Sequence, residues 1–263
     1  MDNMVIAGLT GSGKDTLINA ILRECILCNE VGKFTYVYID PTHCEFSPFG
    51  NVKRVTMFNE LMAHFDETNY LNSIRKFLTR LFWLVECNCK NETLVVVINN
   101  YDALPKYLTM LVEYYVSVLK NNTMIKFIVA VQGNSNDCNF KDFRYKALTR
   151  TTEEVSNSLI HCNLASSCAD KYGTCWFFDE DVPDVYTKIN VEFTPDFLNK
   201  RLLKSLSSSK STDMCIVTAM NNLQVNLPWE VEEAKVLEVL RSFYGGGQID
   251  YNYIKCVTLE GEE

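Results

Sequence analysis

The most informative stretch of this chain is Gly8-Leu9-Thr10-Gly11-Ser12-Gly13-Lys14-Asp15-Thr16. It follows the apolar run Met4–Ala7 and leads into an amphipathic run over residues 17–28. A strand, a glycine-rich turn ending in Gly-Lys, and a helix form the P-loop pattern, in which backbone N–H groups surround a phosphate chain. The positive end of the helix and the lysine ammonium favour the same ligand. The stretch therefore predicts a purine-nucleotide site, with ATP as the cofactor, built from Gly8, Thr10, Gly11, Ser12, Gly13, Lys14, Asp15 and Thr16.

One position of this loop departs from the usual pattern. After the lysine, a P-loop carries Ser or Thr, whose hydroxyl binds Mg²⁺. Here Asp15 occupies that position, and the hydroxyl comes one place later, at Thr16. A carboxylate beside the β-phosphate repels it unless a metal intervenes. The sequence thus predicts ATP binding, leaves the presence of Mg²⁺ open, and names no protein ligand for a metal.

The composition bounds the kind of protein that the chain can form. With 263 residues, 47% of them hydrophobic, it makes one large domain or two small ones. A net charge of −8 argues against nonspecific coating of DNA. No apolar stretch has membrane-spanning length, and the first strand begins so early that we expect no signal peptide.

Eleven cysteines, an odd number without regular spacing, favour a reducing compartment. Cys25-x-x-Cys28 and Cys87-x-Cys89 supply four thiols that a zinc ion accepts as ligands. We favour buried, metal-free thiols, because a helical Cys-x-x-Cys lacks the turn glycines of a zinc ribbon. The three histidines are scattered, and no Ser/His/Asp or Cys/His catalytic set is visible.

Strand and helix patterns alternate through the first half of the chain. Apolar β-branched runs predict strands over 34–40, 94–98 and 126–131, and helical spacing predicts helices over 69–87 and 107–119. This alternation is typical of an α/β fold with a RecA-like parallel sheet, in which the phosphate loop lies at the carboxyl end of the first strand.

The second half is divided by changes in composition. We expect a P-loop core over residues 1–146, a shortened lid or connector over 147–208, and a small winged-helix-like module over 209–263. The connector is predicted to hold a short strand at 147–148, a helix capped at 151–154 and running through Ile160, a strand at 175–178 and a helix at 194–206. A Ser-rich linker over 205–212 precedes the module.

The acids that an ATPase uses for hydrolysis are missing. Such an enzyme carries Asp-Glu after its central strand, to hold the Mg²⁺ water shell and to activate the attacking water. Here the strand 94–98 is followed by Asn99 and Asn100, and the nearest acid, Asp102, comes three places late. Gln132 ends the next strand, where a sensor of the terminal phosphate would lie, with Asn134 a weaker choice. We therefore expect Asn99 to contact the nucleotide, name no catalytic residue, and expect hydrolysis to be absent or slow.

The order of several stretches resembles the AAA+ ATPases of the origin recognition complex, most of all its fifth subunit. The resemblance is carried by Gly-Leu-Thr-Gly-Ser-Gly-Lys at 8–14, Val-Val-Val-Ile-Asn-Asn-Tyr-Asp-Ala-Leu at 95–104 and Lys-Phe-Ile-Val-Ala-Val at 126–131. Residues 148–155 look like the entry to the lid, and residues 223–231 and 249–254 look like parts of the winged-helix module.

This resemblance implies an ATP-binding subunit that acts in the initiation of DNA replication without needing to hydrolyse ATP. It implies other AAA+ subunits as partners, DNA contact through the assembled complex, no membrane association and a nuclear location. The chain departs from that family in its short segment before the P-loop and its short lid. Arg201 is the candidate for the lid's sensor arginine.

Three other interpretations stay open. Tyr-Val-Tyr-Ile-Asp-Pro at 36–41 and the strand ending at Gln132 are similar to FtsK/HerA-type DNA-translocating or packaging ATPases, although the missing acids count against an active motor. Gly-Lys-Asp-Thr at 13–16 also suits a small nucleotide kinase, whose lid arginines would be Arg144, Arg150 or Arg201. The last alternative is a degenerate P-loop domain that serves only as a scaffold.

Overall fold

The computed structural model describes residues 2–27, 34–42, 55–58, 69–86, 93–119, 125–132, 139–167 and 173–191, with residues 234, 238–240 and 242 near the C-terminus. For residues 82–86 it describes the backbone alone. Within these ranges, no helix has both the length and the apolar character that crossing a membrane requires.

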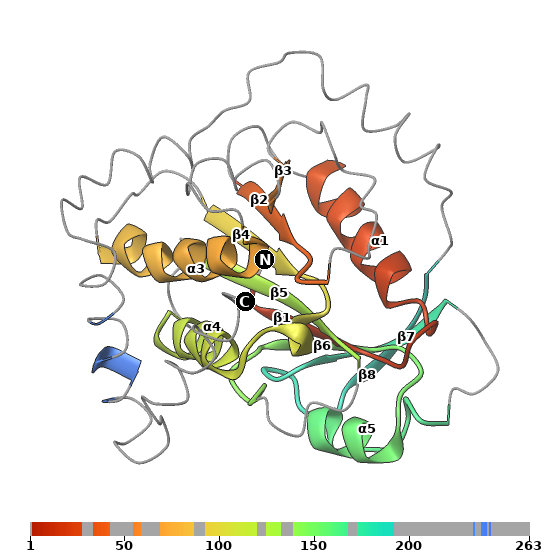
Figure 1. The fold of residues 1–263 in the computed structure, drawn as a ribbon. Helices are drawn as coiled ribbons and strands as arrows, with labels where there is room; N and C mark the ends of the chain where they lie inside the picture. The colour runs from red at the N-terminus through yellow and green to blue at the C-terminus, as the bar shows by residue number, and fades with distance from the viewer. Residues whose placement is uncertain are drawn as a thin grey trace.

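An eight-stranded sheet forms the centre of the molecule, in the order β3-β2-β4-β5-β1-β6-β7-β8 (Figure 1). Neighbouring strands from β3 to β6 are parallel, and the pairs β6–β7 and β7–β8 are antiparallel. The strands are β1 (Met4–Ala7), β2 (Phe34–Ile39), β3 (Val55–Met57), β4 (Thr93–Ile98), β5 (Ile125–Val131), β6 (Tyr145–Leu148), β7 (Thr174–Asp179) and β8 (Tyr186–Asn190). The predicted α/β class with a mostly parallel sheet is confirmed.

Helices cover both faces of this sheet, as a parallel sheet requires. Figure 1 shows α1 on one side and α3 and α4 on the other. Their bounds are α1 (Lys14–Leu27), α3 (Tyr70–Glu86), the short 3₁₀ helix η2 (Tyr101–Ala103), α4 (Lys106–Val118) and α5 (Glu153–Ile160). The helices predicted over 69–87 and 107–119 are confirmed to within one or two residues.

Successive residues of the central strands belong to two different cores. Val96 and Ile98 of β4 pack with the side chains of α3 and α4, whereas Val95 and Val97 pack with those of α1. Because side chains alternate across a strand, a strand buried on both faces is apolar at every position. This is why the continuous apolar runs of the sequence locate β2, β4 and β5 correctly.

The helix α5 begins and ends with local capping contacts. The Thr152 hydroxyl accepts a hydrogen bond from the Val155 backbone N–H, at 3.3 Å. His161, in the left-handed region with φ 57°, closes the other end, and its N–H bonds to the carbonyl of Asn157. The helix predicted from a Thr/Glu cap through Ile160 is therefore confirmed.

The sheet extends further along the chain than the sequence indicates. The strand β6 crosses the expected boundary between residues 146 and 147, because it pairs with β1 from Met4↔Tyr145 to Ala7↔Leu148. The hairpin β7–β8 then adds two antiparallel strands inside the segment expected to be a connector. The strand predicted at 175–178 corresponds to β7. The strand β8 was not predicted, since it is an edge strand with four exposed residues and has no apolar alternation.

The predicted helix at 194–206, the linker at 205–212 and almost all of the winged-helix-like module lie outside the described residues. Within the module, residues 234, 238–240 and 242 are helical. Leu240 is 1% exposed and belongs to the core on the α3 and α4 side of the sheet.

Arg144 joins the start of β6 to the end of β7. Its guanidinium donates two hydrogen bonds to the Asp179 carboxylate, each at 3.0 Å, and its Nη1 lies 2.9 Å from Asp181 Oδ2. The hydrogen bond from Arg144 holds the pKa of Asp179 below its usual value. A carboxyl whose pKa is lowered on folding stabilises the folded state above its unfolded pKa, near 4, and loses this contribution as the pH falls through the folded value.

We predict that Arg144→Met lowers the free energy of unfolding at pH 7 and that this loss shrinks towards zero below about pH 4. Urea unfolding of the wild type, Arg144→Met, Asp179→Asn and the double variant measures the coupling of the pair at each pH. A coupling that is the same at pH 7 and pH 3 contradicts the prediction.

Candidate nucleotide-binding site

The P-loop leaves β1 at the carboxyl edge of the sheet and enters α1. Gly11 and Gly13 have φ values of 72° and 94°, a conformation that glycine adopts without strain. The Gly8 N–H donates to the Val131 carbonyl at 3.2 Å, and the Leu9 N–H donates to the Arg150 carbonyl at 2.9 Å. The loop is thus held between the ends of β5 and β6, the two neighbours of β1.

Gly8 is required by packing. A Cβ atom at this position would lie 1.9 Å from Thr149 Oγ1 and 2.5 Å from Ser12 Oγ. These two hydroxyl oxygens are themselves 2.7 Å apart, and Thr149 Oγ1 also lies 3.3 Å from the carbonyl oxygen of Ala7. The base of the loop is therefore closed by a hydroxyl pair that leaves no space for a side chain at Gly8.

Lys14 brings a positive charge to the inside of the loop. It is the first residue of α1 and is 5% exposed, and its Nζ donates to the Leu9 carbonyl at 3.1 Å. The ammonium and the N-terminus of a 14-residue helix both favour an anion at this place. The Lys14 ammonium and the helix N-terminus thus lie together at the P-loop, with Thr16 in the same first turn of the helix.

Asn99 faces the P-loop from the end of β4. It is fully buried, and its Nδ2 donates to Asp15 Oδ1 at 3.1 Å. Its Oδ1 is also buried, and it has no hydrogen-bond partner among the residues that the structure describes. Asp15 and Asn99, which the sequence assigned to the same site, are therefore in direct contact.

Asn100 links three strands at the same edge. It adopts the left-handed conformation with φ 49°, which asparagine tolerates better than most residues. Its Nδ2 lies 3.2 Å from both Asp40 Oδ1 and Thr42 Oγ1, and its Oδ1 accepts from Gln132 Nε2 at 3.0 Å. The ends of β2, β4 and β5 are thereby joined through one asparagine side chain.

Gln132 continues this network to the P-loop. Its Oε1 accepts from the Thr10 hydroxyl at 3.1 Å, and its backbone N–H donates to Asp102 Oδ2 at 3.1 Å. The Asp102 carboxylate therefore caps the end of β5. The amides of Asn100 and Gln132 thus connect Thr10 of the P-loop to Asp40 and Thr42 after β2.

Sequence reasoning left four contributors out of the site, namely Asp40, Thr42, Asn100 and Thr149. Their positions in the sequence could have indicated them, because each of these residues follows the end of a buried parallel strand. The carboxyl ends of neighbouring parallel strands meet at one edge of a sheet, and ligands of open α/β sheets bind there.

Other predicted functional residues lie elsewhere or outside the described ranges. Arg144, a kinase-lid candidate, is paired with Asp179 and Asp181 at the opposite end of β6, and Arg150 flanks the loop through its carbonyl. Asn134, Arg201 and three of the four cysteines considered for zinc are outside the described residues. Cys25 is half-buried, and the described residues include no cluster of three His, Cys, Asp or Glu side chains suited to a metal.

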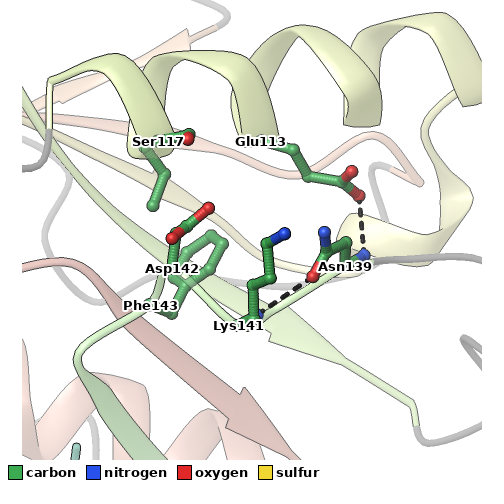
Figure 2. Close-up of a pocket in the computed structure, with 7 residues that line it drawn as sticks. Glu113, Ser117, Asn139, Lys141, Asp142 and Phe143 are labelled. Carbon is green, nitrogen blue, oxygen red and sulfur yellow. Dashed lines mark hydrogen bonds between the residues drawn. The ribbon is translucent and has the colours of Figure 1, made fainter. Parts of the chain in front are cut away.

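A separate hollow lies between α4 and the segment that precedes β6. Figure 2 shows Glu113 and Ser117 of α4 facing this segment, and the Glu113 carboxylate accepts the Asn139 backbone N–H at 3.0 Å. The hollow has a volume of about 290 Å³ and is lined by Glu113, Val116, Ser117, Asn139, Lys141, Asp142 and Phe143. Because no P-loop residue lines it, this hollow is distinct from the site around Lys14.

No protein-family model and no curated protein matches the chain. Solved structures do match its fold. The cytoplasmic domain of the type VII secretion ATPase EccC from Thermomonospora curvata has a TM-score of 0.57 and 13% identity, over 79% of this chain and 28% of that one. ATPases 2 and 3 of EssC from Geobacillus thermodenitrificans have a TM-score of 0.54 and 13% identity, over 78% of this chain and 43% of that one.

A third match is the genome packaging NTPase B204 from Sulfolobus turreted icosahedral virus 2 in complex with ATP-γS. It has a TM-score of 0.47 and 13% identity, over 71% of this chain and 96% of that one. The chain spans less than half of the EccC and EssC chains that it matches. At these identities the EccC and EssC likenesses show the fold alone, a mixed α/β fold that matches P-loop ATPase domains.

We predict that Gly8→Ala destabilises the fold by about 1–3 kcal/mol, as an added methyl group does in a well-packed interior. Thr149→Ala should itself cost about 1 kcal/mol, because it removes the hydroxyl pair. In the double variant, however, the space left by the hydroxyl accommodates the new methyl group. Denaturant unfolding gives the free energy of unfolding of the wild type, the two single variants and the double variant. The double variant should lose less of this free energy than the sum of the two single losses. Strict additivity would contradict the proposed steric cause.

Proposed function

We propose that this chain is an ATP-binding P-loop domain of the FtsK/HerA type that holds its nucleotide with little or no hydrolysis. One observation carries the proposal. Lys14 and the N-terminus of α1 face the carboxyl edge of a parallel sheet, and neutral amides stand there at the positions where a hydrolysing enzyme has its acids. Lys14 and the helix N-terminus favour a triphosphate. The neutral amides stand in place of the acids that would hold the metal and activate water.

The likeness of the fold to EccC and EssC supports the FtsK/HerA type over the origin-recognition reading. Both likenesses extend over more than three quarters of the chain. The EccC match is a type VII secretion ATPase, and the FtsK/HerA type includes DNA-translocating and packaging ATPases. The proposal therefore places this chain in an assembly that transports either a protein or DNA. In such an assembly the bound nucleotide stabilises the folded subunit by mass action.

The origin-recognition resemblance gives a weaker second proposal. It is favoured by Asn99 and Asn100, since a subunit that binds ATP structurally has no use for the two acids. AAA+ partner subunits, DNA contact through the complex and a nuclear location all belong to this second proposal. The nucleotide-kinase alternative has less support, because the Arg144 guanidinium is held by Asp179 and Asp181 away from the loop.

We predict that ATP raises the melting temperature of the wild-type protein and that Lys14→Ala abolishes the shift. A ligand at 100 times its dissociation constant stabilises the folded state by about 2.7 kcal/mol, which is enough to be seen by thermal denaturation. Lys188→Ala, which removes a lysine from the exposed edge strand β8, is the matched control and should keep the full shift. A wild-type protein that shows neither a shift nor ATP binding by calorimetry would refute the proposal.

We also predict that ATP hydrolysis stays well below about 1 s⁻¹, the low end for phosphoryl-transfer enzymes. Asn99 and Asn100 can position groups by hydrogen bonding but cannot accept the proton of the attacking water. Phosphate release under saturating ATP measures the rate. Steady turnover above this value that disappears in Lys14→Ala would identify an active motor, and transfer of phosphate to a nucleoside monophosphate would identify a kinase.

A further inference from the structure

Two departures from the P-loop pattern meet at one place in the structure. Asp15 stands where the loop normally has the Mg²⁺-binding hydroxyl, and Asn99 stands where the strand normally has the metal-holding acid. Their side chains are hydrogen bonded at 3.1 Å, although they lie 84 residues apart in the chain. In the usual pattern the loop supplies a neutral hydroxyl oxygen and the strand supplies a carboxylate. Here the loop supplies the carboxylate, from Asp15, and the strand supplies the neutral oxygen, from Asn99.

The orientation of the Asn99 amide follows from this contact. Its Nδ2 donates to Asp15 because a carboxylate only accepts, so Oδ1 points away from the aspartate. Asn99 is 0% exposed, and its Oδ1 is buried without a partner among the described residues. An unsatisfied buried acceptor destabilises a fold, because no hydrogen bond replaces the water that it loses on burial. A cation, or a water molecule bound to it, would satisfy this oxygen.

The charge of Asp15 indicates the same ligand. The helix N-terminus favours a carboxylate in the first turn, but a triphosphate on Lys14 would bring several negative charges close to it. A divalent cation between the two removes that repulsion. Mg²⁺ is usually held by one or two carboxylates together with substrate phosphates, and it keeps several waters. Such a site does not require a cluster of three protein ligands, and none is present in the described part of the chain.

The other acids at this edge already have protein contacts. Asp40 accepts hydrogen bonds from Thr42 and Asn100, and Asp102 accepts the Gln132 backbone N–H. Asp15 is thus the acid that directly contacts Asn99 at the mouth of the loop.

We propose that Asp15 and Asn99 form an exchanged Mg²⁺ site, in which the loop supplies the carboxylate that binds the metal and the strand supplies a neutral oxygen that holds the metal's water shell. The site rests on the proposed function, since the phosphates of ATP complete the coordination of the metal. It is a binding site and implies no hydrolysis, because the exchange restores no group that can activate water.

The test measures ATP affinity with Mg²⁺ and with EDTA, by calorimetry, for a set of variants. Wild-type protein should bind ATP at least about tenfold more tightly with Mg²⁺ than in EDTA. Groups around a bound metal typically change the affinity for that metal by about tenfold or more. Asp15→Asn should still bind ATP in EDTA but lose the gain from Mg²⁺. The double variant Asp15→Ser/Asn99→Asp, which returns both groups to their usual places, should regain it. Asp181→Asn, which removes a charge beside Arg144 at the opposite end of β6 from the loop, should behave as the wild type does.

A second readout uses Mn²⁺ in place of Mg²⁺. The electron paramagnetic resonance signal of Mn²⁺ with ATP should change on binding to the wild type and to the double variant, but not on binding to Asp15→Asn. Equal ATP affinity of the wild type with and without metal, or full metal dependence in Asp15→Asn, would overturn the exchanged site while ATP binding itself stands. Absence of ATP binding under both conditions would overturn the proposed function, and this site with it.

Discussion

The position of β1 in the middle of the sheet is the constraint on which the candidate site depends. β1 pairs in parallel with β5 on one side and with β6 on the other, and its residues Val5, Ile6 and Ala7 are fully buried. The loop that follows β1 is hydrogen bonded to the ends of both neighbours, at Val131 and Arg150. A short strand of four residues thereby fixes where the phosphate-binding loop lies relative to every other strand end.

Neutral amides perform a structural task at this edge that acids cannot perform. Asn100 donates to Asp40 and accepts from Gln132 at the same time. A carboxylate at that position would only accept, and it would lie beside the charge of Asp40. Asparagine at this position therefore allows a continuous connection from Thr10 of the loop, through Gln132 and Asn100, to the end of β2.

The two sides of the sheet differ in what they hold. The α1 side carries the P-loop helix, so its core, with Leu17, Ile18 and Leu22, anchors the helix whose N-terminus follows the P-loop. The α3 and α4 side holds the larger core, which also includes Leu240 from near the C-terminus. The hollow beside Glu113 opens on this second side, away from the P-loop. Packing on one face therefore positions the loop, and packing on the other joins distant parts of the chain.

Much of the fold was determined by the sequence alone. The P-loop, the three central strands and the helices after them are specified by local signals, because glycine spacing, continuous apolar runs and helical periodicity each act over a few residues. The edge strands β3 and β8 lack such a signal, since they are short or exposed.

Which polar side chains of the site are hydrogen bonded to one another follows from the tertiary structure alone. The contacts Asp15–Asn99, Asp40–Asn100 and Asn100–Gln132 join residues 84, 60 and 32 positions apart. No local pattern encodes which polar side chain at one strand end meets which at the next, because that depends on the order of the strands in the sheet. The same order separates Arg144 from the loop and carries the sheet past residue 146, which residue spacing could not reveal.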